Sequence, residues 1–156
     1  IDYVKNRAEW NQADLIISGS SQGGASSLLL SALEAQTTVT NSNVPALCDH
    51  HGAKAGRQPG WPNAIANQKN QDLKEKTSET MAYFDAVNFA KYIKSPTFIV
   101  VGFIDRTCPA SGVYAAYNQI KAEKKIIHDV LGGHRVSKFY SDGTKQWIEK
   151  YRFIEE

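Results

Sequence analysis

The sequence predicts an α/β fold, with a mostly parallel sheet of about four strands flanked by helices. Short apolar runs alternate with helix-like segments along the chain, and this alternation favours parallel pairing. The strongest run, "PTFIVVGF" at 96–103, is rich in β-branched residues. It is apolar throughout rather than at every second position, as expected of a strand covered on both faces.

Each element follows from a local pattern. Ala and Leu favour a helix at 22–35, and Pro109 suits the first turn of a later helix. The Gly/Pro-rich stretch at 50–64 predicts a loop or lid. In chain order we expect a short helix within 1–12, strands at 14–19 and 44–49 ("VPALCD"), solvated helix 69–83, strand 96–103, helix 109–122, strand 124–131 and an amphipathic helix at about 137–153.

Composition narrows the function classes. The chain has 156 residues, enough for one domain with a core, and is 42% hydrophobic with a net charge of +2. The sequence has no basic block that would indicate a nucleic-acid partner. No apolar run approaches the length needed to span a membrane. Cys48 and Cys108 are expected to be buried free thiols. The N-terminus has neither a signal-peptide pattern nor an initiator Met, and the compartment is left open.

The stretch Gly19-Ser20-Ser21-Gln22-Gly23 fits the pattern G-x-S-x-G. Between a strand and a helix this pattern is typical of a nucleophile elbow, a tight turn that presents a reactive serine. Small residues two before and two after Ser21 relieve backbone crowding, and the N–H of Gln22 would supply one oxyanion donor. A plain strand–helix loop is the alternative that the pentapeptide alone leaves open.

A serine nucleophile needs a base, and the base needs an orienting carboxylate. Asp105 follows the strand at 96–103, and His134 follows the strand at 124–131. Each alone has an ordinary explanation, a turn-forming Asp and a structural His. Their order in the chain, and the shared sheet edge at which parallel strands end, predict a triad of Ser21, Asp105 and His134.

The run "CDHH" at 48–51 raises the possibility of a metal site. Cys and His are zinc ligands, yet this spacing fits no closed zinc pattern. We therefore expect loop histidines at His50 and His51, and no metal or cofactor.

The motifs resemble those of the acetyl xylan esterase / cephalosporin-C deacetylase family, carbohydrate esterase family 7 of the α/β-hydrolase superfamily. The resemblance lies in "GSSQGGASSLLLSAL", "VPALCD", "YFDAVNFAKYIKSPTFIVVGFIDRTCPASGVYAAYN" and "GGH", from about residue 14 to 135. It implies that Ser21 is the nucleophile, Asp105 the acid, His134 the base and Gln22 an oxyanion donor. It further implies removal of acetyl groups from acetylated xylo-oligosaccharides or similar small acetyl esters, no metal, and ring-like homo-oligomers.

Two departures from the family pattern stand out. Arg135 follows His134 where the family has Glu; its charge disfavours an imidazolium if it lies near the ring and has little effect if it points to solvent. The family's first half, with its Arg-Gly-Gln motif and second oxyanion donor, is absent. We therefore expect 1–156 to be a single partial domain, the C-terminal half of an α/β-hydrolase fold.

The missing half predicts reduced activity. Losing one oxyanion donor costs about 10²–10³ in rate, and the strand at 14–19 becomes an apolar edge that invites pairing with another chain. We expect weak or no activity alone, and self-association or association with the missing half. The alternatives to an esterase are a serine hydrolase of the dienelactone-hydrolase or peptidase type, and a half-domain that does not catalyse.

Overall fold

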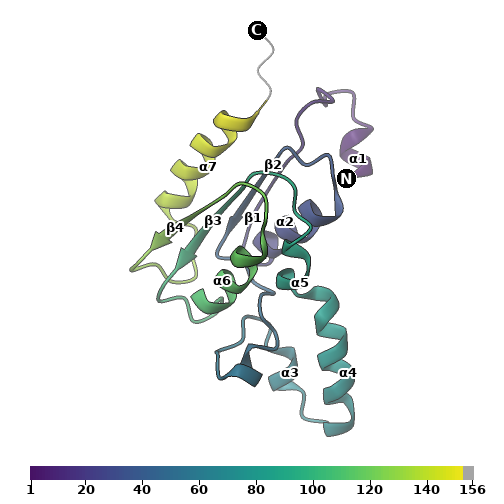
Figure 1. Cartoon of the computed structure of the whole chain (residues 1–156), viewed down its shortest axis with the longest axis vertical. Helices are drawn as coiled ribbons and strands as arrows, with labels where there is room; N and C mark the ends of the chain where they lie inside the picture. The colour runs from purple at the N-terminus through teal and green to yellow at the C-terminus, as the bar shows by residue number, and fades with distance from the viewer. Residues whose placement is uncertain (153–156) are drawn as a thin grey trace.

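The computed structural model describes residues 1–152, which form a parallel sheet covered by helices (Figure 1). The strands are β1 (Ile16–Ser20), β2 (Val39–Asn43), β3 (Thr97–Gly102) and β4 (Lys124–Asp129). Their order in the sheet is β1-β2-β3-β4, and every neighbouring pair is parallel. The predicted fold class is confirmed.

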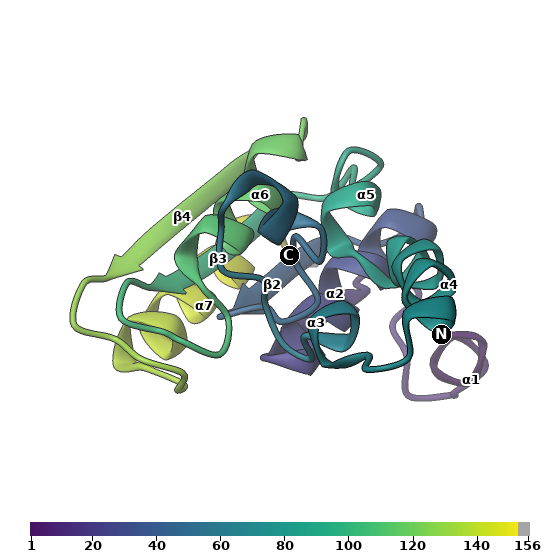
Figure 2. The ribbon, with the colours of Figure 1, turned by 90° about the horizontal axis from the view of Figure 1, so that it is seen from below.

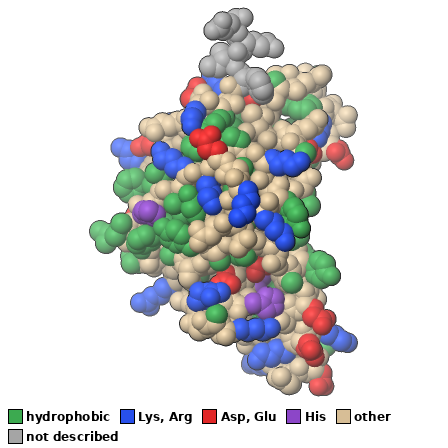
Figure 3. All heavy atoms as spheres, viewed as in Figure 1, with side chains coloured by type: hydrophobic (Ala, Val, Ile, Leu, Met, Phe, Trp, Pro, Cys, Tyr) green, Lys and Arg blue, Asp and Glu red, His purple; other side chains and the backbone are tan. Residues whose placement is uncertain are grey.

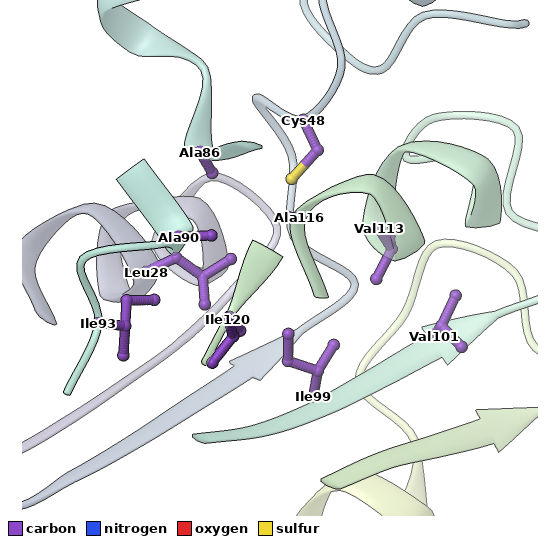
Figure 4. Close-up of a cluster of buried hydrophobic side chains, with 10 residues drawn as sticks. All are labelled: Leu28, Cys48, Ala86, Ala90, Ile93, Ile99, Val101, Val113, Ala116 and Ile120. Atoms are coloured by element: carbon purple, nitrogen blue, oxygen red, sulfur yellow. The ribbon is translucent and has the colours of Figure 1, made fainter. Parts of the chain in front are cut away.

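Helices cover both faces of the sheet. On one face, α2 (Gln22–Leu33), α5 (Ala86–Ala90) and α6 (Ala110–Gln119) enclose a core of aliphatic side chains with Ile99 and Val101 of β3 (Figure 4). On the other, α7 (Lys138–Tyr151) packs Trp147 against Phe98 and Val100. Figure 2 shows α6 and α7 on opposite sides of β3. Alternate residues of β3 therefore face the two cores, as its apolar sequence predicts.

The helix starts follow from their sequences. The side chain of Ser137 accepts a hydrogen bond from the Tyr140 N–H at the start of α7, and Pro109 precedes α6. The helix predicted at 1–12 is limited to α1 (Asp2–Lys5).

An arm of short helices lies between β2 and α5. It contains η1 (Gly52–Ala55), α3 (Ala64–Asn67), α4 (Gln71–Met81) and η2 (Ala82–Phe84), and it extends below the sheet in Figure 1. The backbone N–H of Trp61 donates to the Thr107 carbonyl, 2.9 Å away, which ties the arm to the loop after β3. The predicted loop at 50–64 and helix at 69–83 correspond to this arm.

The predicted strand at 44–49 is wrong, because the second strand is β2, five residues earlier. β2 has the sequence "VTNSN", and all five residues are buried. Its Thr and Ser side chains are satisfied by α2 and the loop before β3: Thr40 bonds Ser31 and Ser95, and Ser42 donates to the Gly24 carbonyl. A strand that buries polar side chains against specific partners has no apolar run in its sequence. The hydrophobicity pattern therefore predicted the strand in the apolar loop that follows β2.

Apolar side chains are exposed near the carboxyl ends of β3 and β4. Hydrophobic groups gather at the left of Figure 3, the side on which β4 lies in the same view. Four exposed large side chains belong to the loops there: Phe103, Ile104, Val130 and Leu131. β1 pairs with β2 alone among the described residues, so it is an edge of this sheet. Within residues 1–152, no helix has the length and apolar character needed to span a membrane.

Candidate active site

Ser21 lies in the tight turn between β1 and α2. Its backbone angles, φ 57° and ψ −120°, are uncommon for a residue with a side chain and are typical of strain held at a functional turn. The turn is pinned to the sheet, because the Ser21 N–H donates to the Asn43 carbonyl (2.9 Å) and the Ser21 carbonyl accepts from Ala46 (3.0 Å).

The turn requires glycine at one of the two motif positions. A Cβ on Gly19 would lie 2.2 Å from the carbonyl oxygen of Gly23, whereas a Cβ on Gly23 would meet nothing within 4 Å. Crowding therefore restricts Gly19, whereas the prediction that crowding also requires a small residue at Gly23 is wrong.

Gly19→Ala should lower the free energy of unfolding by about 3 kcal/mol, because a backbone atom cannot move aside as a flexible side chain does. Gly23→Ala is the matched control and should change it by less than about 1 kcal/mol. Urea denaturation followed by circular dichroism measures both. Equal stability of the two variants would show that the turn tolerates a Cβ at Gly19.

The structure brings the three predicted side chains together. Ser21 Oγ lies 2.8 Å from His134 Nε2, and His134 Nδ1 lies 2.9 Å from Asp105 Oδ2. Ser21 follows β1, Asp105 follows β3 and His134 follows β4, so the shared carboxyl edge of the sheet assembles the group.

The Asp105 carboxylate is fully buried and held by backbone donors. Its Oδ1 accepts the N–H groups of Thr107 (2.8 Å) and Cys108 (2.9 Å), which leaves Oδ2 for His134. These bonds fix the direction of the carboxylate and satisfy its Oδ1 in a place that water cannot reach.

Cys108 lies beside this group. Asp105, Cys108 and His134 each offer a ligand atom, all within 4.8 Å of one another, and no other such cluster occurs in residues 1–152. Burial, with the neighbouring Asp105 charge, raises the pKa of the Cys108 thiol to about 12. The thiol therefore stays protonated near neutral pH, where it is neither a nucleophile nor a thiolate ligand. Both cysteines are free and buried, as predicted.

Gln22 is the first residue of α2 and is exposed. The first bond into this helix is made later, by the Ala25 N–H to the Ser21 carbonyl (3.0 Å). An N–H at such a position has no intrahelical acceptor and points out of the helix start, beside Ser21. It is therefore available to an anionic ligand.

The other predicted residues lie as follows. Arg135 is exposed, and its guanidinium makes no ion pair or hydrogen bond with residues 1–152, which favours the solvent-facing alternative.

The two loop histidines lie in the arm. His51 Nε2 is 2.8 Å from Ser78 Oγ, on α4. His50 is buried, and burial lowers its pKa. Neither histidine belongs to a cluster with metal-ligand geometry among the described residues.

Two side chains behind the nucleophile turn were missing from the sequence prediction. The Tyr140 hydroxyl, from α7, lies 2.7 Å from Ser18 Oγ and donates a longer bond to the Gly19 carbonyl (3.4 Å). Asn43, at the end of β2, donates to Ser20 Oγ (2.9 Å). Tyr140 belongs to a helix that the sequence predicts from its apolar face alone, which gives no sign of a role for the hydroxyl. Asn43 belongs to a polar run that does not predict a strand.

Comparisons with known proteins show which proteins this chain is similar to. A family model described as acetyl xylan esterase (AXE1) matches residues 1–151. The acetyl esterase Axe7A of Xylanibacter ruminicola is 34% identical over 150 residues, which is 96% of this chain and 34% of that protein. Acetyl xylan esterase structures from Paenibacillus sp. R4 (TM-score 0.86) and Thermoanaerobacterium sp. JW/SL YS485 (TM-score 0.78) are each 28% identical, over 96% of this chain and 49% of theirs.

The fold extends to more distant hydrolases. An acylaminoacyl peptidase of Pyrococcus horikoshii superposes with a TM-score of 0.74 at 16% identity, which shows the fold alone. The chain spans about a third of the curated relative and about half of each esterase structure.

Proposed function

Because the chain belongs to the acetyl xylan esterase family, we propose that it is the part of a serine esterase that carries the nucleophile, the base and the acid. The observation that carries this proposal is the continuous chain of contacts from Ser21 Oγ through His134 to the buried Asp105 carboxylate, at 2.8 and 2.9 Å. Hydrogen-bond distances of this kind are what general-base activation of a serine requires.

In the proposed reaction, Ser21 Oγ attacks the acetyl carbonyl carbon while His134 Nε2 takes the hydroxyl proton. The imidazolium then returns that proton to the departing sugar oxygen, and the C–O bond of the ester breaks to leave an acetylated Ser21. Water, deprotonated by His134, attacks the carbonyl carbon of this intermediate. The bond from that carbon to Ser21 Oγ then breaks, the imidazolium returns the proton to Ser21 Oγ, and acetate is released. Asp105 holds the imidazole with its proton on Nδ1 and stabilises the imidazolium, while remaining charged itself.

The charge that develops on the carbonyl oxygen needs hydrogen-bond donors. The Gln22 N–H at the start of α2 would supply one of them, aided by the positive end of the helix dipole. A second donor would come from outside residues 1–156, in the part of the enzyme that this chain does not contain. We therefore expect turnover by the isolated chain about 10²–10³ below that of the complete enzyme.

The proposed substrates are acetylated xylo-oligosaccharides or similar small acetyl esters, because the family model and the relatives named above are acetyl esterases. The complete site would be formed with the N-terminal half of the fold, or within a homo-oligomer. The exposed apolar side chains beside the site and the free edge of β1 support such an association.

Covalent labelling tests the proposal. A fluorophosphonate probe should modify the chain once, and mass spectrometry should map the adduct to Ser21. Ser21→Ala should abolish labelling, whereas Ser26→Ala, a change on α2, should leave it intact. Folded protein that stays unlabelled, or an adduct on Ser20, would contradict the assignment and favour a half-domain without catalysis.

Substrate profiling then tests the substrate class. The chain, or the chain supplemented with its N-terminal half, should release acetate from acetylated xylose. Cleavage of peptide amides without release of acetate would instead favour a peptidase.

A further inference from the structure

Asn43 is the last residue of β2 and lies under the candidate active site. It pairs in register with Ser20 on β1 and with Val100 on β3, so it occupies the sheet between the nucleophile turn and the strand that leads to Asp105. Its backbone carbonyl accepts the Ser21 N–H, and its side chain is fully buried. No element of the reaction described above uses this side chain.

The Asn43 amide contacts both halves of the serine–histidine pair. Its Nδ2 donates to Ser20 Oγ (2.9 Å), one residue before Ser21. The same Nδ2 donates to the Arg135 carbonyl (3.2 Å), one residue after His134. A carbonyl oxygen accepts hydrogen bonds and cannot donate them, so the amide must turn its nitrogen toward Arg135. The Nδ2 group of one amide thus joins the nucleophile turn, 23 residues before Asn43, to the His134 loop, 92 residues after it.

We propose that Asn43 is a positioning residue, which holds the nucleophile turn and the His134 loop at the separation needed for proton transfer. The inference rests on the proposed function, because that separation matters only if His134 is the base of Ser21. Proton transfer is sensitive to geometry, and a displacement of about 1 Å can lower a rate about a hundredfold. The buried Asn43 side chain bonds both loops through its Nδ2, and its backbone carbonyl accepts the Ser21 N–H, so Asn43 is well suited to prevent such a displacement. Its Oδ1 has no hydrogen-bond partner among residues 1–152.

Asn41 provides a matched comparison. It lies two residues earlier on β2, so its side chain points to the same face of the sheet, and it is equally buried. Its side-chain oxygen and nitrogen have no hydrogen-bond partner among residues 1–152. Two asparagines in one strand therefore share burial and face, while one of them contacts the nucleophile turn and the His134 loop.

Leucine substitutions separate positioning from stability. Asn43→Leu and Asn41→Leu each keep the branched shape and remove the amide. In fluorophosphonate labelling followed at several probe concentrations, Asn43→Leu should lower the maximal rate constant of inactivation 10- to 100-fold and leave the probe's apparent binding constant unchanged. Asn41→Leu should leave both values within twofold. Amide hydrogen exchange at residues 133–136 should be at least tenfold faster in Asn43→Leu, and unchanged in Asn41→Leu.

A second variant covers the case in which Asn43→Leu does not fold. Ser20→Ala removes one acceptor of the Asn43 amide with a small change in volume. It should lower the maximal inactivation rate a few fold. Where Asn43→Leu does fold, adding Ser20→Ala to it should lower the rate no further, because the effects of coupled residues are not additive. Additive effects of the two changes would contradict the inference.

The outcomes distinguish this inference from the proposed function. Normal inactivation and exchange in Asn43→Leu, or in Ser20→Ala where that variant alone folds, would overturn the positioning role while Ser21 remains the nucleophile. If the wild-type chain is not labelled, the proposed function fails. The exchange comparison still decides whether Asn43 holds the His134 loop: faster exchange at 133–136 supports that restraint, and equal exchange refutes it.

Discussion

Replacing His134 with alanine should lower the rate at which Ser21 is acylated by about 10⁶-fold. Without the imidazole, Ser21 Oγ keeps its proton and is a poor nucleophile, since the 2.8 Å contact to Nε2 is its route for losing that proton. The loss should equal that of Ser21→Ala, and the double variant should lose no more, because the two residues act as one unit. The burst of p-nitrophenol from p-nitrophenyl acetate, or the rate of fluorophosphonate labelling, measures this.

His128→Ala is the control for His134. His128 lies on β4, and its Nε2 is 2.6 Å from the Tyr114 hydroxyl, away from Ser21. This variant should keep the acylation rate of the wild type. Rapid acylation in His134→Ala would remove His134 from the role of base and would require another proton acceptor for Ser21.

Asp105→Asn should lower the acylation rate by about 10⁴-fold while the protein stays folded. The asparagine oxygen can still accept from Thr107 and Cys108, which places its NH₂ group where Oδ2 now faces His134. The NH₂ group donates to Nδ1, so the ring proton moves to Nε2 and the base faces Ser21 in the wrong tautomer. Stopped-flow measurement of the p-nitrophenol burst gives the rate, and thermal unfolding monitors the fold.

Asp85→Asn separates the loss of a buried carboxylate from the loss of chemistry. The Asp85 carboxylate is also buried, and it accepts the N–H groups of Asp49, His50 and Val87 outside the candidate site. This variant should unfold at a lower temperature while its folded fraction is acylated at the normal rate. If Asp105→Asn behaved in the same way, Asp105 would stabilise the loop after β3 without orienting His134.

The sequence predicted the three residues of the candidate triad because each of them follows a strand with a clear signal or lies in a motif. Ser21 lies in G-x-S-x-G, and Asp105 follows the apolar β3. Parallel strands end at one edge, so topology alone brings such residues together. Side-chain distances, the strained angles of Ser21 and the backbone donors to Asp105 depend on loop conformations that no short pattern encodes.

Asn43 shows why the rest was not predictable. Asn43 lies in a strand that is polar yet buried. The residues to which its side chain donates hydrogen bonds are 23 and 92 residues away in the sequence. Patterns of hydrophobicity report burial of apolar side chains, so they miss a strand stabilised by hydrogen bonds to its neighbours. For the same reason, hydrophobicity wrongly predicted the second strand at 44–49 instead of at β2.

The three side chains of the candidate triad come from loops after the first, third and fourth strands of the sheet, and Ser21 lies 113 residues before His134. No local segment can therefore bring Ser21 and His134 together, so we expect Ser21 of an unfolded or partly folded chain to be unreactive. The fraction of chains that react with a serine probe should therefore measure the fraction of chains whose strands are paired in the native register. During urea titration, reactivity should disappear with the cooperative loss of the whole sheet, so the same probe that identifies the nucleophile also reports folding yield.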